Sequence, residues 1–89
     1  MFVIIATDKP NSRDLRAANR QAHLDYADST GVVTLGGPFL DAEGNMTGSL
    51  IILDLPDMAA AEAWAAADPY SRAGLFETVS IRAWKKVRG

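Results

Sequence analysis

The stretch GSLIILDL, residues 48–55, combines a run of large apolar side chains with two adjacent β-branched residues, Ile51 and Ile52. Such a run predicts a β-strand. Successive side chains of a strand point to opposite faces of its sheet, so this strand is apolar on both faces. The amino-terminal stretch FVIIA, residues 2–6, has the same character. We therefore expect both segments in the centre of one sheet.

The surrounding sequence alternates strand and helix signals in the order βαββαβ. Turn residues at 41–45 and the proline at position 69 separate the elements. Asn11 or Ser12 is expected to cap the first helix, Gly31 to end it, and Asp57 to cap the second. The predicted strands are Phe2–Thr7, Val32–Leu35, Gly48–Leu55 and Phe76–Val87, and the predicted helices are residues 12–29 and Met58–Ala67.

This order predicts a single α+β domain over residues 1–89 with a ferredoxin-like fold. In this fold a four-stranded antiparallel sheet carries both helices on one face. Helical spacing predicts that Leu15, Ala18, Ala22 and Tyr26 form the buried stripe of the first helix, with His23 at its edge.

The two helices can cover only one face of a sheet whose central strands are apolar on both. A second copy of the chain, packed sheet to sheet, is the expected cover, and the sequence therefore predicts a homodimer through the open face. The alternative is a monomer with an exposed apolar sheet.

Composition excludes several classes of protein. The chain of 89 residues has 9 basic and 11 acidic residues and no cysteine. The expected third strand, SLIILDL, has no aromatic residue and one acid, so we expect no nucleic-acid binding. No apolar segment reaches the length of a membrane span, and we expect a cytoplasmic protein with no membrane contact. Phosphate-loop, dinucleotide and metalloprotease motifs are missing, so no cofactor or metal is expected.

Two residues are candidates for chemistry. His23, the single histidine, is either a general acid/base or a packed residue bonded to a backbone carbonyl. Asp68, in the stretch AAADPY, either orients an imidazole or is ordinary loop punctuation before a proline.

Several motifs resemble the YciI-like (YCII-related) proteins over nearly the whole chain. These are R-x-x-H-L at 20–24, GGP at 36–38, GS at 48–49 and ADPYSRAGLFETVSIRAWKKV at 67–87. The resemblance implies a ferredoxin-like fold that dimerises into an α+β barrel. It also implies an active site with a histidine and an aspartate, which match His23 and Asp68. One relative is a dehydrochlorinase that acts on a chlorinated hydroxyquinol.

Five further residues at matched positions are candidates for shaping the pocket. Gly37 and Pro38 would let the backbone approach a ligand, and Ser49 would donate a hydrogen bond. Arg20 would hold an anionic group or face water, and Tyr70 would close the cleft or pack.

The first functional hypothesis is a lyase or isomerase in which His23 moves a proton of a cyclic, phenolic or enolisable substrate and Asp68 fixes the imidazole tautomer. The alternatives are a module that binds a small metabolite without reaction, and a purely structural dimerisation domain. One difficulty is geometric. Antiparallel helices end at opposite ends of the sheet, so His23 and Asp68 meet only if the chain folds back after Pro69 or a partner subunit supplies one of them.

Overall fold

The two apolar segments lie side by side in the centre of the sheet. In the computed structural model, which describes residues 1–89, β1 (Phe2–Asp8) pairs antiparallel with β3 (Met46–Leu53). The edges are β2 (Val33–Leu40), beside β3, and β4 (Phe76–Ala83), beside β1, so the strand order is β2-β3-β1-β4. All three pairings are antiparallel, as expected for the ferredoxin-like α+β fold.

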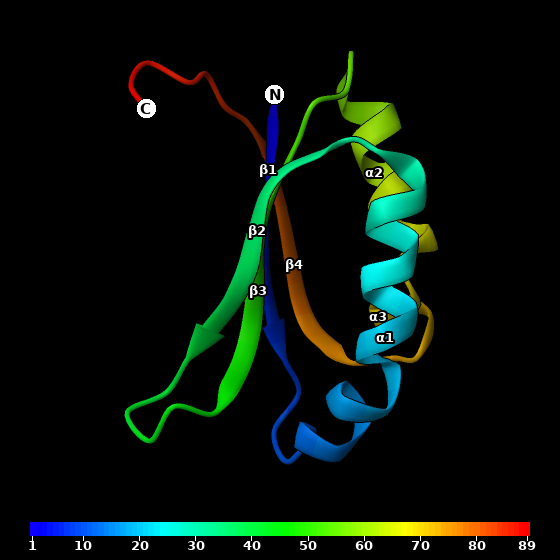
Figure 1. Cartoon of the computed structure of the whole chain (residues 1–89), viewed down its shortest axis with the longest axis vertical. Helices are drawn as coiled ribbons and strands as arrows, with labels where there is room; N and C mark the ends of the chain where they lie inside the picture. Colours follow the sequence, from blue (N-terminus) through cyan, green and yellow to red (C-terminus); the bar gives the residue numbers. More distant parts are fainter.

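Three helices cover one face of this sheet, and the other face carries none (Figure 1). They are α1 (Arg13–Thr30), α2 (Met58–Ala67) and a short α3 (Pro69–Arg72), which was not predicted. Gly31 ends α1 in the left-handed conformation, with φ of 67°. The Asp57 carboxylate accepts a hydrogen bond from the amide of Ala60 and so caps α2. Ser12 takes the N-cap position of α1, but its side chain makes no capping bond.

The bounds of β2, β3 and β4 differ from the expected ones by more than one residue. β2 does not stop at Leu35 but continues through Gly36, Gly37 and Pro38 to Leu40. A proline is compatible with this strand because β2 is an edge strand, where one side of the ladder needs no amide donor. β3 begins two residues earlier and ends two residues earlier than predicted, and β4 ends at Ala83 instead of Val87.

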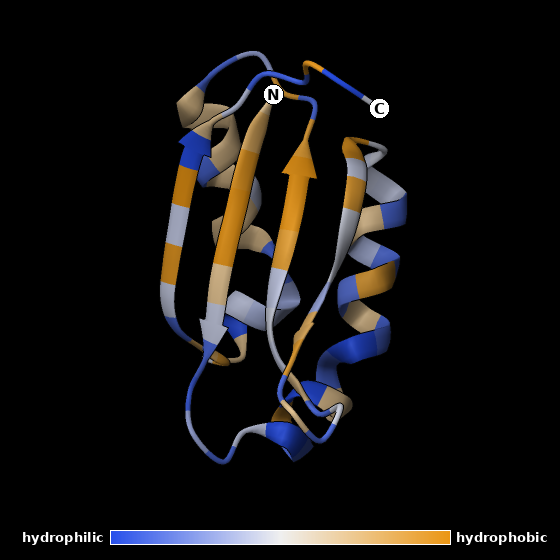
Figure 2. Ribbon diagram, turned by 90° about the vertical axis from the view of Figure 1, so that its left-hand side faces the viewer, coloured by the Kyte–Doolittle hydropathy of each residue, from blue (hydrophilic) through white to orange (hydrophobic).

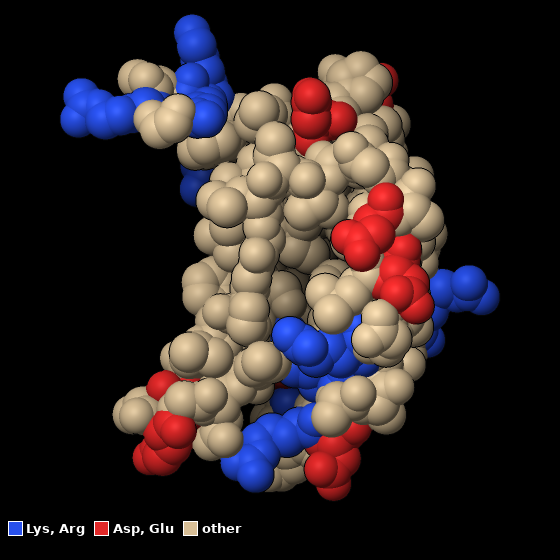
Figure 3. Space-filling model, in the orientation of Figure 1, with Lys and Arg blue, Asp and Glu red and all other residues tan.

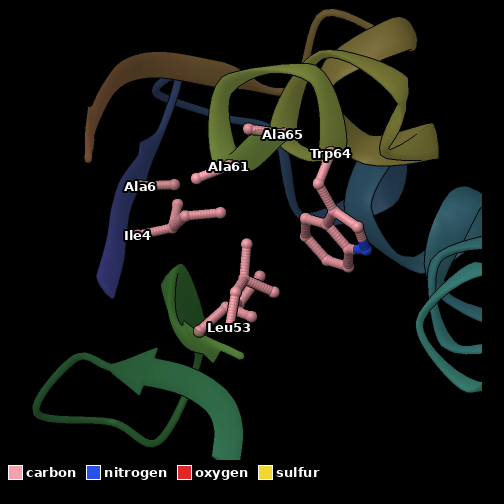
Figure 4. Close-up of a cluster of buried hydrophobic side chains, with 7 residues drawn as sticks. Ile4, Ala6, Leu53, Ala61, Trp64 and Ala65 are labelled. Carbon is pink, nitrogen blue, oxygen red and sulfur yellow. The ribbon is translucent and has the colours of Figure 1, made fainter. Parts of the chain in front are cut away.

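The core lies between the sheet and α2. Ile4 of β1 is paired with Ile51 of β3, and both are buried beneath α2, which contributes Ala61, Trp64 and Ala65 (Figure 4). On β4, Ile81 stands opposite Ile4 on this face and Arg82 stands opposite Val3 on the other.

The buried stripe predicted for α1 is wrong for three of its four residues, and only Tyr26 packs against the core. Leu15, Ala18 and Ala22 are exposed, and the inward face is instead formed largely by polar side chains. The residues of α1 that are buried or half-buried are Arg16, Asn19, His23, Tyr26 and Ala27. Apolar residues mark the inward face of a helix only where that face meets a hydrophobic core. The inward face of α1 instead faces a cavity lined in part by polar groups. His23 therefore lies in the centre of the inward face and not at its edge.

Figure 2 looks onto the open face of the sheet and shows hydrophobic residues along the central strands β1 and β3. The side chains of this face include Val3 and Ile5, which stand opposite Ile52 and Leu50 of β3. Leu35 and Phe39 of β2 extend this surface and are 63% and 41% exposed. The central strands are therefore apolar on both faces, as the sequence indicated. None of the helices is both long enough and apolar enough to cross a bilayer.

Candidate active site

His23 and Asp68 meet within one chain. The Nδ1 atom of His23 lies 2.8 Å from Oδ1 of Asp68. The geometric difficulty disappears because His23 lies seven residues before the end of α1, about 10 Å along the helix. The antiparallel α2 ends at Ala67, level with this middle part of α1. No partner subunit is needed to bring the two side chains together.

Asp68 is held by the local structure of the chain that follows α2. Its carboxylate accepts a hydrogen bond from the amide of Tyr70 at 2.9 Å, which makes it the N-cap of α3. Pro69 occupies the first turn of α3, where its fixed φ fits and its missing N–H is not needed. The Asp68 side chain is only 2% exposed. Asp68 is thus more than loop punctuation, because the same oxygen serves the backbone of α3 and the imidazole.

Tyr70 packs directly against the imidazole. The rings of Tyr70 and His23 are stacked, with centroids 4.1 Å apart and planes inclined by 13°. Phe76 contacts the Tyr70 ring edge-on. Tyr70 is almost completely buried, at 1% exposure. The imidazole is therefore fixed in its plane by the Asp68 hydrogen bond and across its plane by the tyrosine ring.

Arg16, which sequence reasoning missed, joins this cluster from two turns earlier on α1. Its Nε donates to Asp8 at 2.7 Å and its Nη2 donates to Ser49 at 2.6 Å. The guanidinium carbon lies 4.6 Å from the centre of the Tyr70 ring. Arg16 is 5% exposed, so this is a buried charge with a buried partner. Its spacing of seven residues from His23, which places both on one face of a helix, was the available signal.

A cavity of about 410 Å³ opens between α1 and the edge strand β2. Figure 3 looks toward this side of the molecule and shows the hollow, with Lys and Arg side chains gathered at its lower end and acidic side chains along α1. The cavity wall brings together nearly all of the residues predicted for the site: Arg20, His23, Gly37, Pro38, Ser49 and Tyr70. Asp68 is not in the wall but lies behind His23. Arg16 also lines the cavity.

Gly36, which was not predicted, faces the cavity more directly than Gly37. Gly36 stands opposite Ile51, whose side chain points to the helix-covered face, whereas Gly37 stands opposite Leu50 of the open face. A Cβ atom at Gly36 would meet Val33 and Ile51 at ordinary van der Waals distances of 3.6 and 3.9 Å. The absence of a side chain at Gly36 therefore leaves room in the cavity.

Two tyrosines have pKa values above the ordinary value. Burial raises the pKa of the Tyr70 hydroxyl, although the guanidinium groups of Arg16 and Arg20 act in the opposite direction. Burial also raises the pKa of Tyr26, and the negative charge of Asp68 adds to this effect. Both side chains are therefore phenols rather than phenolates at neutral pH.

His23 lines the cavity, and its second ring nitrogen, Nε2, is free. With Asp68 as an ionised carboxylate, which can only accept, Nδ1 carries the proton of the neutral imidazole and Nε2 carries a lone pair. Nε2 makes no hydrogen bond within the chain. Since every buried side-chain nitrogen and oxygen has a hydrogen-bond partner, Nε2 is not one of the buried atoms. The arrangement can accept a proton at Nε2 from a molecule in the cavity.

A larger hollow of about 710 Å³ lies between residues 6–14 and the β2–β3 hairpin. It has no histidine in its wall, and apart from Phe39 no aromatic residue, so it offers less to a small organic ligand than the cavity at His23. The structure contains no cluster of three His, Cys, Asp or Glu side chains placed to hold a metal ion.

Fold and site together define a small ferredoxin-like α+β protein with a histidine–aspartate pair beside a cavity of ligand size. The family model of the YCII-related domain matches residues 1–85. The chain therefore belongs to the YCII-related family.

Comparison with individual proteins agrees with this assignment. The chain is 38% identical to protein YciI of Escherichia coli O6:H1 over 96 aligned positions, which cover 98% of both chains. Among solved structures, it is similar to the 5-chloro-2-hydroxyhydroquinone dehydrochlorinase TftG of Burkholderia phenoliruptrix AC1100 in complex with 2,5-dihydroxybenzoquinone. The TM-score is 0.89 at 32% identity, and the match covers 94% of this chain and 92% of the other. An antibiotic biosynthesis monooxygenase shares the fold alone, with a TM-score of 0.61 at 18% identity over 99% of this chain and all of the other.

Proposed function

We propose that this protein is an enzyme of the lyase or isomerase type that acts on a small cyclic, phenolic or enolisable substrate. The observation that carries the proposal is the hydrogen bond of 2.8 Å from His23 Nδ1 to the buried Asp68, which leaves Nε2 of a cavity-lining residue without a partner in the chain. A dehydrochlorinase among the structural neighbours, bound to a dihydroxybenzoquinone, supports this class of substrate.

In the proposed reaction Nε2 of His23 takes a proton from carbon or oxygen of the substrate. When the proton comes from carbon, the C–H bond breaks, its electron pair forms a carbon–carbon double bond, and the adjacent carbonyl becomes an enolate. The enolate then either takes a proton at another carbon, which is isomerisation, or expels an anion such as chloride with its bonding electrons, which is elimination. Asp68 fixes the imidazole tautomer and stabilises the imidazolium that forms.

The test uses 5-chloro-2-hydroxyhydroquinone, with chloride release as the measured product. His23→Gln is the variant of choice, because the amide of glutamine can still donate to the buried Asp68. We expect the variant to keep its thermal stability and to lose at least about a hundredfold in rate, the usual contribution of a general base. Equal rates would refute the proposed mechanism.

A second readout covers other substrates of the same class. Incubation of 2,5-dihydroxybenzoquinone in deuterated buffer should lead to exchange of its ring C–H protons, seen by NMR, faster with the native protein than with His23→Gln. Binding of these compounds without chloride release or exchange, and unaffected by His23→Gln, would favour the alternative of a non-catalytic metabolite-binding module.

We also propose that the apolar open face of the sheet is covered by a second copy of the chain, which gives a homodimer. Ile5 and Leu35, which are 40% and 63% exposed in the single chain, belong to this surface. Sedimentation should show a dimer for the native chain, and Leu35→Lys combined with Ile5→Lys should dissociate it. A native chain that stays monomeric at high concentration would contradict the proposal.

The cytoplasmic location expected from the sequence stays a prediction.

A further inference from the structure

We propose that Arg16, Ser49 and Tyr70 form an oxyanion-binding site at the floor of the cavity. The site takes a single oxygen atom of the phenolate or enolate kind, which carries or acquires a negative charge. This inference deepens the proposed function, because it says where the charge goes when His23 removes a proton.

The donors of Arg16 are only partly used within the chain. A guanidinium has five N–H groups. Nε and Nη2 donate to the two oxygens of Asp8 at 2.7 and 3.3 Å, and Nη2 also donates to Ser49 at 2.6 Å. Nη1, which carries two N–H groups, makes one long contact of 3.5 Å to the Tyr70 hydroxyl. The edge of Arg16 nearest Tyr70 therefore retains hydrogen-bonding capacity.

The two hydroxyl groups beside Arg16 also have donors to spare. The oxygens of Ser49 and Tyr70 both accept from the guanidinium, so the hydrogen of each hydroxyl points to some other acceptor. Neither hydroxyl donates to any group of the chain, and both residues line the cavity together with Arg16. An oxygen atom of a ligand is the acceptor that would satisfy all three residues at once.

The positive charge of Arg16 is already in place before a ligand arrives. The Arg16 and Asp8 side chains are each 6% exposed, so the ion pair is fixed by the fold rather than by solvent. Preorganised donors in such a sheltered position stabilise a developing negative charge more strongly than water does. Arg20, in contrast, lines the cavity as an exposed residue and can turn toward water.

The position of this site relative to His23 suits the proposed proton transfer. Arg16 and His23 stand on the same face of α1, and both contact the Tyr70 ring, at 4.6 and 4.1 Å from its centre. A small planar substrate beside Tyr70 thus has the base at one end and the oxyanion donors at the other. The electron pair released when the C–H bond breaks ends on the oxygen at Arg16, while the proton ends on Nε2 of His23.

The test measures the ionisation of a bound phenol and needs no turnover. The probe is 4-nitrophenol, whose phenolate has its own visible absorption band. An opposite charge within about 4–6 Å lowers the pKa of an acid by about one to three pH units. We expect the pKa of 4-nitrophenol bound to the native protein to fall by at least about one pH unit from its value in water.

Three variants assign this effect to the proposed donors. Ser49→Ala and Tyr70→Phe each remove one hydroxyl and keep the shape, and each should weaken phenolate binding about tenfold, as for one hydrogen bond to a charged group. Removing Arg16 alone would leave Asp8 buried and unpaired, so Asp8→Asn with Arg16→Gln removes both charges together. In this double variant the bound phenol should recover its pKa in water.

The matched control is Arg13→Gln, an exposed arginine of the same helix outside the cavity wall, which should change nothing. The proposal is overturned if the native protein does not bind 4-nitrophenol, if the bound phenol keeps its pKa in water, or if the double variant behaves like the native protein. It is equally overturned if Arg20→Gln alone abolishes the effect. A reaction that proceeds without His23 would refute the proposed function but leave this result intact.

Discussion

The imidazole of His23 lies face to face with the phenol ring of Tyr70, with 4.1 Å between the ring centroids. Tyr70 is the second residue after Asp68, and its amide hydrogen bonds to the same Asp68 oxygen that receives His23 Nδ1. The short segment 68–70 therefore holds the imidazole both in its plane and across its plane. The position of the His23 ring therefore depends on α3 as well as on α1.

Replacement of Asp68 should separate its two roles. Asp68→Asn keeps an acceptor for the amide of Tyr70 and should change the free energy of unfolding by less than about 1 kcal/mol, because asparagine is as good an N-cap. It removes the negative charge beside the imidazolium, and we expect chloride release from the test substrate to slow by about a hundredfold.

Asp68→Ala is the companion variant, and it should also lower the free energy of unfolding by about 1–2 kcal/mol through loss of the cap. Since His23 is the single histidine of the chain, its nitrogen NMR signals report the tautomer without ambiguity. In the native protein the proton of the neutral ring should be on Nδ1. A tautomer that is unchanged in Asp68→Ala would contradict the orienting role.

The buried ion pair between Asp8 and Arg16 should matter for stability. Asp8→Asn leaves the guanidinium, whose contact with Asp8 Oδ2 is 2.7 Å, without its counter-charge. The expected loss is about 3 kcal/mol or more in the free energy of unfolding, measured by urea denaturation. Asp14→Asn, an exposed acid in the first turn of the same helix, is the control and should change little. Equal losses in the two variants would mean that the pair contributes nothing specific.

Stability should fall at alkaline pH, in part through Tyr70. Burial raises the pKa of Tyr70 in the folded chain above its unfolded value. The unfolded chain therefore releases this proton first, at about pH 10, and the free energy of unfolding decreases as the pH rises from there through the folded pKa. In Tyr70→Phe this part of the decrease should be absent between pH 9 and 11, measured by urea denaturation. An identical pH profile in the two proteins would exclude the contribution.

Gly36→Val should fill the cavity without disturbing the sheet. The new side chain would point toward Val33 and Ile51 in the cavity wall, and valine is favoured in strands. We expect binding of 4-nitrophenol to weaken at least about tenfold, while the melting temperature stays the same or rises. Undiminished binding would show that ligands enter elsewhere.

The two central strands could be predicted because a strand that is covered on both faces is apolar at every position. The runs FVIIA and LIIL are apolar at every position, which identifies the central strands without any knowledge of their partners. The inward face of α1, in contrast, is largely polar. Its polar residues Arg16 and His23 line a cavity, and the apolar Leu15 is exposed in the single chain. A rule that equates apolar with inward therefore failed where the candidate site lies.

The contact between His23 and Asp68 could not be predicted from spacing. It depends on how far the two antiparallel helices are shifted along each other, and the spacing of residues does not give this shift even though the bounds predicted for α2 are correct. Arg16 was missed for a related reason. An arginine in a helix usually faces water, and only the positions of Asp8 and Ser49 on neighbouring strands show that it is buried.

The two walls of the cavity contribute different kinds of residues. The groups that we propose to move a proton or hold a charge come from α1, α3 and the centre of the sheet, whereas the opposite wall includes residues of β2, an edge strand paired on one side only. Gly36, Gly37 and Pro38 of this strand line the cavity but do not belong to the hydrophobic core, so they can change without repacking it. Related chains can thus bind different ligands while they keep the same His23–Asp68 pair. β2 is therefore the segment to randomise when a new specificity is sought.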